Sequence, residues 1–240
     1  MNDTNNTQIS GTLQGYAAYP ETSGRFPGVV VIMEAYGING HIRGVCQRLA
    51  NAGFVAVAPD IYHGEVISYT DTDKVMAKIP TVRDEPTLNE IGESLNWLAE
   101  HKNVMPKQLG IIGFCMGGRL AFLANCRFPD QLKAAVGFYG GGIAPGGPDR
   151  FGRTPPIGEA HKMQAPIFLG YGADDQGILP AEHARVAETL STAKKRYTLA
   201  VYPGAGHGFL CEERANYAPK AAELAWPEII GFLRTNLGMH

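Results

Sequence analysis

The chain has 240 residues, with 21 Lys and Arg against 23 Asp and Glu, and its formal net charge is −2. Generic binding to nucleic acid or to an anionic membrane needs an excess of positive charge, so this balance argues against both. Hydrophobic residues make up 45% of the chain and charged residues 18%, which is typical of a folded protein with a sizeable core and excludes disorder over most of the chain.

The N-terminal segment is polar and lacks the pattern of an export signal. Residues 1–10 contain no positive region followed by an apolar stretch, and no run in the chain approaches the roughly 18 apolar residues of a membrane span. We therefore expect a cytoplasmic protein with one domain over residues 1–240, in which residues 1–10 form a flexible polar tail. The cysteines contain no C-x-x-C pair, so neither a metal site nor a disulfide framework is expected.

Strands and helices alternate from residue 26 onward. A β-branched run at residues 26–33 predicts a buried strand, and apolar residues at helical spacing from Ile42 to Leu49 predict the helix that follows. A second strand is predicted at residues 54–58. The next apolar stripe, from Leu88 to Leu98, predicts a helix that precedes a strand at residues 109–114. The rest of the pattern predicts helices at 117–127, 181–192 and 220–233 and strands at 134–139, 167–171 and 197–202.

This alternation predicts an α/β fold with a mostly parallel sheet and helices on both faces. Residues 62–86 and 140–156 lack a clear period and are predicted as loops, which either cover a substrate or lie plainly on the surface. There is no P-loop and no G-x-G-x-x-G after a strand, so the sequence gives no support to nucleotide binding.

The sequence around Cys115 has the pattern of a nucleophile elbow. It reads Gly113-Phe-Cys115-Met-Gly117-Gly118 between a predicted strand and a predicted helix, with Cys in the place of the usual Ser. Small residues are needed two positions before and after the nucleophile, because side chains there would strike the adjoining strand and helix. The helix dipole favours a thiolate at this place. We interpret Cys115 as the nucleophile, the alternative being a buried structural cysteine.

A base and an orienting acid follow two later strands. His207 lies in a glycine-rich loop after residues 197–202 and is the predicted base, whereas ordinary surface roles are expected for the other histidines. Asp174 and Asp175 both follow the strand at 167–171. We favour Asp175, three residues after Gly172 and three before Ile178, but Asp174 stays an alternative. The order Cys, Asp, His is that of α/β-hydrolases.

The chain resembles the dienelactone hydrolase (carboxymethylenebutenolidase) family. The resemblance rests on the elbow at Cys115, on Asp175 and His207, and on Glu34 at the end of an early strand, and it extends over about residues 26–235. It implies a single-domain α/β-hydrolase fold. It also implies that Glu34 interacts with the resting thiol and helps to activate it when substrate binds, the alternative being a satisfied acid at a strand end.

The reaction implied by the resemblance is the opening of dienelactone to maleylacetate in the degradation of aromatic compounds. Cys115 would attack the ester carbonyl and form an acyl-enzyme, while the backbone N–H groups of Met116 and Ala35 hold the oxyanion. No metal and no organic cofactor is implied. The expected partner is a small-molecule ester or lactone, not nucleic acid or a membrane, and the expected assembly is a monomer or a small homo-oligomer.

Dienelactone carries a carboxylate, so a positive side chain should line the pocket. Relatives that degrade aromatic compounds place an Arg shortly after the catalytic His, but Cys211 stands at the fourth position after His207 here. Arg214 and Arg83 are the candidates for the carboxylate contact. Two alternatives stay open: a carboxylesterase or thioesterase for another small activated ester, and a non-catalytic binding protein of the same fold. Packing roles are expected for Cys46, Cys126 and Cys211.

Overall fold

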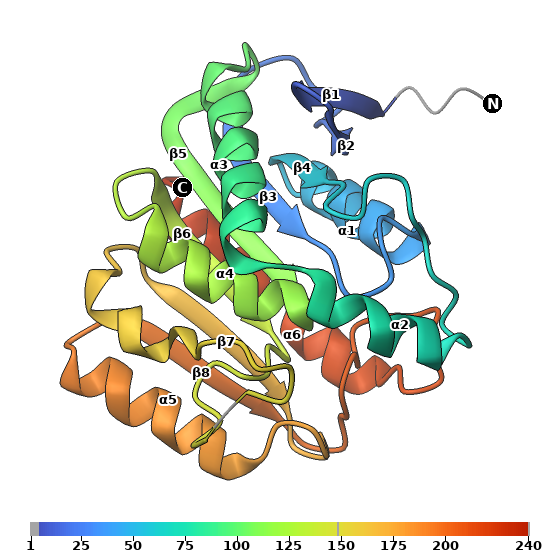
Figure 1. Cartoon of the computed structure of the whole chain (residues 1–240). Coiled ribbons are helices and arrows are strands. Elements are labelled where there is room, and N and C mark those ends of the chain that lie inside the picture. Colours follow the sequence, from blue (N-terminus) through green and yellow to red (C-terminus); the bar gives the residue numbers. More distant parts are fainter. Residues whose placement is uncertain (1–4, 148, 240) are drawn as a thin grey trace.

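The computed structural model describes residues 5–147 and 149–239 (Figure 1). Within these residues, eight strands form one sheet in the order β1-β2-β4-β3-β5-β6-β7-β8. The two pairs made by β2 are antiparallel and the remaining pairs are parallel. The strands are β1 (Asn6–Ser10), β2 (Leu13–Ala18), β3 (Phe26–Ile32), β4 (Val55–Pro59), β5 (Val104–Phe114), β6 (Leu132–Phe138), β7 (Ile167–Gly172) and β8 (Tyr197–Tyr202).

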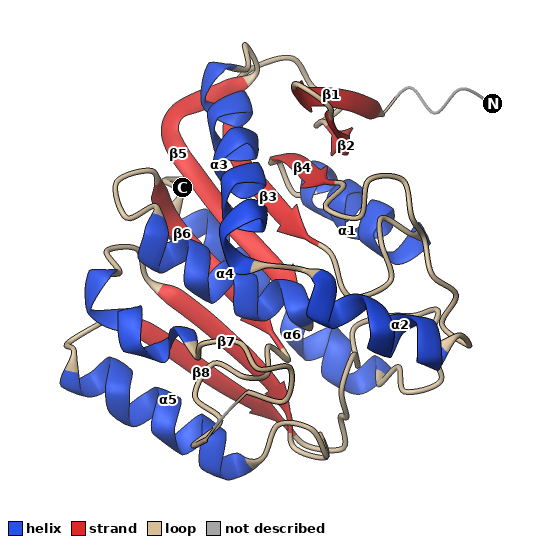
Figure 2. Cartoon of the chain, viewed as in Figure 1, coloured by secondary structure: helices blue, strands red, loops and turns tan. Residues whose placement is uncertain are grey.

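Helices cover both faces of this sheet (Figure 2). On one face α1 and α6 are neighbours, since the Arg48 guanidinium of α1 lies 4.7 Å from the Trp226 ring centre of α6. On the other face α3 and α4 are joined by the ion pair of Asp84 with the buried Arg119, at 2.7 Å. The helices are α1 (Gly40–Asn51), α2 (Thr72–Lys78), α3 (Asp84–Glu100), α4 (Met116–Arg127), α5 (Pro180–Thr192) and α6 (Pro219–Asn236), with 3₁₀ turns η1 (Ile79–Thr81) and η2 (Pro156–Lys162).

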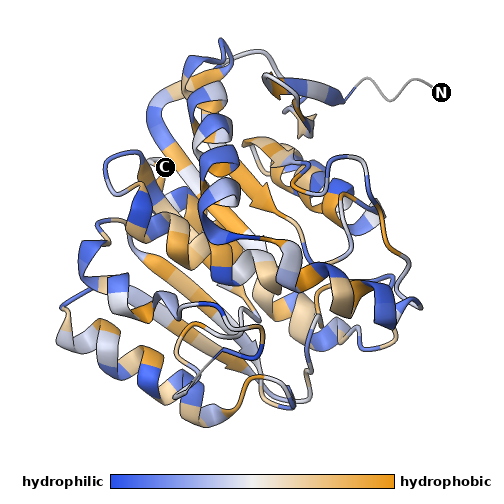
Figure 3. Ribbon diagram, in the orientation of Figure 1, coloured by the Kyte–Doolittle hydropathy of each residue, from blue (hydrophilic) through white to orange (hydrophobic). Residues whose placement is uncertain are grey.

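The hydrophobic pattern explains why these elements form. The predicted stripe of α1 is buried at Ile42, Val45, Cys46 and Leu49, and β3 is buried along all but its first residue. Apolar residues accordingly concentrate in the central strands and on the inner sides of the helices (Figure 3). These observations confirm the predicted single-domain α/β fold with a mostly parallel sheet. No helix in the described part of the chain is long and apolar enough to cross a membrane.

Part of the predicted N-terminal tail is a strand. Residues 6–10 form β1, which pairs with β2, and Ile9 is buried; residues 1–4 lie outside the described residues. The prediction of a tail over residues 1–10 is therefore wrong for β1. The segment is polar except for Ile9, so its composition gave no sign of a strand. The strand β2 was absent from the prediction.

The region predicted as an irregular loop at residues 62–86 contains α2, η1 and the start of α3. The Asp71 side chain caps α2 by accepting a hydrogen bond from the Lys74 N–H. Only Val75 of α2 is buried, so this short helix shows no apolar stripe in the sequence. The second predicted loop extends from the end of β6 to η2, as the sequence indicates, although η2 begins at its last residue.

Candidate active site

Cys115 lies in the sharp turn between β5 and α4. Its φ of 55° and ψ of −119° are unusual for a residue with a side chain, and such strain is concentrated at functional sites. The turn is held on both sides: the Cys115 N–H donates to the Phe138 carbonyl at 2.9 Å, and the Cys115 carbonyl accepts from the Gly118 N–H at 2.9 Å. The thiol is partly exposed.

The glycines around Cys115 are required by the close approach of the backbone. A Cβ atom at Gly113 would overlap the Gly117 carbonyl, and one at Gly117 would overlap the carbonyl oxygens of Ile32 and Met33 at the end of β3. Small residues at both positions let the elbow sit directly against the neighbouring strand. The sequence predicted that larger side chains at these two positions would strike the adjoining elements, and the structure identifies the atoms they would strike.

The His207 imidazole lies between Cys115 and Asp175. Its Nε2 is 3.1 Å from the Cys115 Sγ, and its Nδ1 is 2.8 Å from the Asp175 Oδ2. The other carboxylate oxygen of Asp175 accepts hydrogen bonds from the N–H groups of Gly177 and Ile178, at 2.8 and 3.2 Å. The structure thus brings Asp175 to the imidazole, whereas Asp174 is exposed.

The charges in this row favour a protonated imidazole. Burial lowers the pKa of His207, but the nearby Cys115 and Asp175 more than offset it and raise this pKa to about 10. Burial raises the pKa of Asp175, yet the hydrogen bond and charge of His207 and two backbone N–H groups hold it below its ordinary value of 3.8. Asp175 is therefore ionised at neutral pH, and it fixes the proton on Nδ1.

Glu34 is fully buried directly after the end of β3. Neither of its oxygens has a hydrogen-bond partner among the described residues, although the Arg214 Nη1 lies 3.7 Å from Oε1. Burial raises the pKa of Glu34, while Arg214 and His207 pull it down. The Tyr139 hydroxyl lies near this carboxylate and is also buried without a partner in the described chain.

Of the two arginines predicted to bind substrate, only Arg214 lies at the site. Its guanidinium is near Glu34 and lies 5.2 Å from the Tyr36 ring centre and 5.9 Å from that of Tyr69. Arg83 is exposed immediately before α3, and no contact joins it to Cys115, His207 or Glu34 within the described residues.

The predicted oxyanion donors lie at neighbouring strand ends. Ile32 of β3 is paired with Gly113 of β5, and Ala35 and Met116 each come three residues later. Met116 is the first residue of α4, where backbone N–H groups have no partner within the helix. The Ala35 N–H has no acceptor among the described residues, and the Ala35 carbonyl accepts from the Tyr62 hydroxyl at 3.3 Å.

Three tyrosines at the site were missed in the sequence. Tyr139 directly follows β6 and Tyr36 comes four residues after the end of β3, so the rule that functional side chains gather at the carboxyl ends of parallel strands could have found both. Tyr69 comes from the segment without period and carried no such signal; its hydroxyl lies 3.2 Å from the Cys211 Sγ.

Two histidines expected at the surface are buried instead. His183 stacks on the Tyr171 ring at 4.2 Å, with only 8% of the residue exposed. The Nε2 atom of His41 is buried. His41, Glu34 and Cys211 form a group of possible metal donors in the described chain.

Comparison with known proteins gives the same assignment as the sequence motifs. Residues 13–237 match the model of a family described as the dienelactone hydrolase family. A protein from Synechocystis sp., provisionally named a carboxymethylenebutenolidase, is 33% identical over 94% of this chain and 92% of its own length. A Bradyrhizobium sp. protein, provisionally named a 2-oxo-3-(5-oxofuran-2-ylidene)propanoate lactonase, is 34% identical over 92% of this chain and 89% of its own.

Solved structures agree with these sequence relatives. The crystal structure of a provisionally named dienelactone hydrolase from Klebsiella pneumoniae superposes with a TM-score of 0.84 at 32% identity, covering 92% of each chain. A dienelactone hydrolase-like promiscuous phosphotriesterase from metagenomic libraries shares the fold, with a TM-score of 0.79 at 23% identity over 96% of each chain. The predicted α/β-hydrolase fold is confirmed.

Proposed function

The chain belongs to the dienelactone hydrolase family, and from this premise we propose that it opens dienelactone to maleylacetate through a covalent bond to Cys115. The observation that carries the proposal is the row of Cys115, His207 and Asp175, with contacts of 3.1 and 2.8 Å. A nucleophile, a base and an orienting acid within hydrogen-bond reach are what acyl transfer requires. A protein that only binds a ligand has no need of all three.

Catalysis begins with the proton shared between Cys115 and His207. The imidazole takes the thiol proton on Nε2, and the imidazolium is stabilised by the Asp175 carboxylate on the other nitrogen. Because burial alone would lower the pKa of His207, its rise to about 10 depends on these two partners. The proton that leaves Cys115 thus stays inside the site, on His207.

The thiolate then attacks the lactone carbonyl carbon. A C–S bond forms, and the carbonyl electrons move to oxygen, whose negative charge would be received by the N–H groups of Met116 and Ala35. The adjacent ends of β3 and β5, which precede these residues, support this role. Collapse of this intermediate breaks the ring C–O bond and opens the ring. The expelled oxygen becomes an enolate within the same acyl chain, which is bound to Cys115 as a thioester.

Water then completes the cycle. In dienelactone the expelled enolate takes a proton from the attacking water, so the hydroxide adds to the thioester and releases maleylacetate and free Cys115. In a simple ester the leaving alkoxide is a stronger base, and His207 would protonate it from Nε2.

Arg214 is the proposed partner of the substrate carboxylate. Its guanidinium lies beside Glu34 and the two tyrosine rings, is 17% exposed, and carries a fixed positive charge. A carboxylate that binds Arg214 would compete with Glu34 for it. Freed from this ion pair, Glu34 could turn toward the thiol, which links substrate binding to activation. The Bradyrhizobium relative is named for a propanoate lactone, in keeping with an anionic substrate.

The second candidate is a carboxylesterase or thioesterase for another small activated ester or lactone. The observation that favours it is the stretch after His207: relatives that degrade aromatic compounds place an Arg shortly after the catalytic His, whereas this chain has Cys211 at the fourth position. Without an Arg there, recognition of a substrate carboxylate would be weaker. Both candidates use the same thiol chemistry.

Steady-state hydrolysis of cis- and trans-dienelactone beside neutral p-nitrophenyl acetate tests the proposal. We expect a strong preference for a dienelactone that is lost in Cys115→Ala, and a rise in KM for dienelactone alone in Arg214→Gln. Weak dienelactone turnover with Cys115-dependent cleavage of the aryl ester would favour the second candidate. Turnover that survives in Cys115→Ala would refute both.

A further inference from the structure

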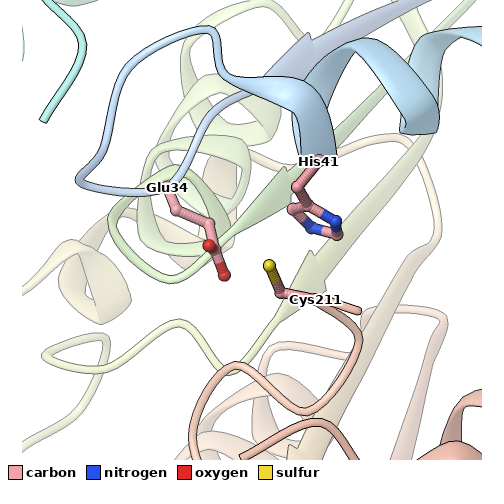
Figure 4. A group of neighbouring side chains, drawn as sticks. All are labelled: Glu34, His41 and Cys211. Carbon is pink, nitrogen blue, oxygen red and sulfur yellow. The ribbon is translucent and has the colours of Figure 1, made fainter. Parts of the chain in front are cut away.

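Three donor side chains meet near His207, whose charge acts on one of them, Glu34. Glu34 follows β3, His41 lies in the first turn of α1, and Cys211 lies in the loop after β8. They point toward one another (Figure 4), and one donor atom from each lies within 4.8 Å of the others. An oxygen, a nitrogen and a sulfur from three separate parts of the chain are thus brought together.

The donor atoms are buried and poorly satisfied. Within the described residues, neither oxygen of Glu34 has a hydrogen-bond partner, and the His41 Nε2 has none either. Burying such atoms without a partner costs free energy, which a bound ion would recover. The Cys211 Sγ is within hydrogen-bond distance of one side chain in the same residues, the Tyr69 hydroxyl at 3.2 Å.

We propose that Glu34, His41 and Cys211 bind a divalent transition metal of the zinc type. A thiolate, an imidazole and a carboxylate are all zinc ligands, and three protein ligands leave a fourth position for water. Mg²⁺ and Ca²⁺, which prefer oxygen donors, fit this set poorly. The site uses no atom of Cys115 or His207, so metal binding goes beyond the proposed hydrolase function. Only the effect on activity that is expected below rests on that function.

The protonation states suit this ligand set. Burial, with the nearby charges of Arg214 and Arg48, lowers the pKa of His41 to about 4, so the imidazole is neutral and keeps a free lone pair. Cys211 is a thiol in the free protein, because burial raises its pKa. On binding, the metal bonds to Sγ and the thiol proton passes to solvent.

The three side chains must move slightly closer together to bind the metal. Bonds of about 2.0–2.3 Å in a tetrahedral zinc site place the donor atoms about 3.5 Å apart, compared with the 4.8 Å limit found here. Rotation of Glu34 away from Arg214, 3.7 Å distant, can supply this movement. The metal therefore has to replace the guanidinium as the counter-charge of Glu34.

His41 also lines a cavity of about 130 Å³ between α1 and α6, together with Arg48, Trp226 and the acidic pair Glu212 and Glu213. Carboxylates at its wall attract cations. Once bound by Glu34, His41 and Cys211, the metal would hold Glu34 and prevent its proposed turn toward Cys115. We therefore expect the metal to inhibit the hydrolase.

Zinc titration of the full chain against a competing chromophoric chelator tests the proposal without any activity assay. We expect one Zn²⁺ per wild-type chain, binding weakened at least tenfold in His41→Gln and in Cys211→Ser, and unchanged binding in Cys115→Ala. Cys46→Ala, which alters a buried cysteine elsewhere, is the matched control. Absence of binding in the wild type would overturn the proposal.

The Cys115→Ala result separates this site from the triad. If Zn²⁺ binding were lost in Cys115→Ala and kept in Cys211→Ser, the metal would be at the nucleophile and the proposal would be wrong. Should a variant fail to fold, Co²⁺ in the wild-type protein gives a second readout: a thiolate-to-cobalt charge-transfer band must persist after Cys115 is blocked with iodoacetamide. Loss of that band on blocking would also contradict the proposal.

Discussion

The His207 imidazole lies between a thiol and a carboxylate, and each contact fixes one ring nitrogen. Asp175 was separable from Asp174 in the sequence only by its spacing from Gly172 and Ile178. The structure supplies the physical reason: two backbone N–H groups hold one Asp175 oxygen, so the other points at Nδ1. The choice between Arg83 and Arg214 had no comparable signal, because the position of Arg83 depends on where α3 begins.

Replacement of Asp175 tests the orienting role. We expect Asp175→Asn to lower kcat/KM by roughly 10²–10⁴-fold, because the imidazole loses the charge that fixes its tautomer and stabilises its protonated form. Asp174→Asn is the matched control, and a change within about twofold is expected for this exposed residue. A larger loss in Asp174→Asn than in Asp175→Asn would reverse the assignment.

Glu34 should influence the reactivity of the Cys115 thiol. Burial raises the pKa of Glu34, and its ionised form disfavours a second negative charge nearby. We therefore expect Glu34→Gln to react faster with neutral iodoacetamide at neutral pH and to show an altered pH profile of alkylation. Glu212→Gln, at an exposed position, serves as the control. Superimposable profiles for wild type and Glu34→Gln would remove the activation role.

Elements with strong periodic patterns were predicted well. The strands from β3 onward and the long helices agree with the sequence to within a few residues, except that β5 begins five residues earlier, at Val104. Its first part is mostly exposed and carries the sequence MPKQ, which has no apolar alternation. The strands β1 and β2 and the helix α2 were missed because each is short, and tertiary pairing or capping stabilises them more than their own composition does.

The elbow imposes a steric requirement that can be measured as stability. We expect Gly117→Ala to lower the free energy of unfolding by about 1–3 kcal/mol or more, because the added methyl group overlaps two carbonyl oxygens at the end of β3. Gly231→Ala is the matched control: it lies exposed in α6, its Cβ would meet nothing, and helix propensity predicts a gain of up to about 1 kcal/mol. Urea unfolding of the wild type and both variants measures these free energies. Equal free energies of unfolding for Gly117→Ala and the wild type would contradict this account of the elbow.

At the scale of the whole molecule, the site exists because the sheet gathers distant segments at one edge. Glu34, Cys115, Asp175 and His207 follow β3, β5, β7 and β8, and all four strands are parallel. This is why the contact of Cys115, Asp175 and His207 could be predicted from motifs that follow strands. Tyr69 and the metal-donor group could not be predicted this way, since they depend on how loops pack against one another.

The same row of charges couples the site to the stability of the whole chain. The pKa of Asp175 is lower in the folded state than its ordinary value of 3.8, so the unfolded chain binds this proton more readily. The ionised Asp175 therefore stabilises the folded state above pH 3.8. This stabilisation is lost as the pH falls through the folded-state pKa. We expect the free energy of unfolding of Asp175→Asn to fall less than that of the wild type between about pH 6 and 3. Asp174→Asn should follow the wild type; parallel curves for all three proteins would show that the coupling is absent.

The central claim is that Cys115 carries the acyl group of the substrate. Mass spectrometry of the enzyme, quenched in acid during turnover of a slow p-nitrophenyl ester, tests it most directly. We predict a mass increase of one acyl group located on Cys115, which is absent in Cys115→Ala and greatly slowed in His207→Ala. Turnover without any acylated Cys115, or an acyl group located on another cysteine, would contradict the account.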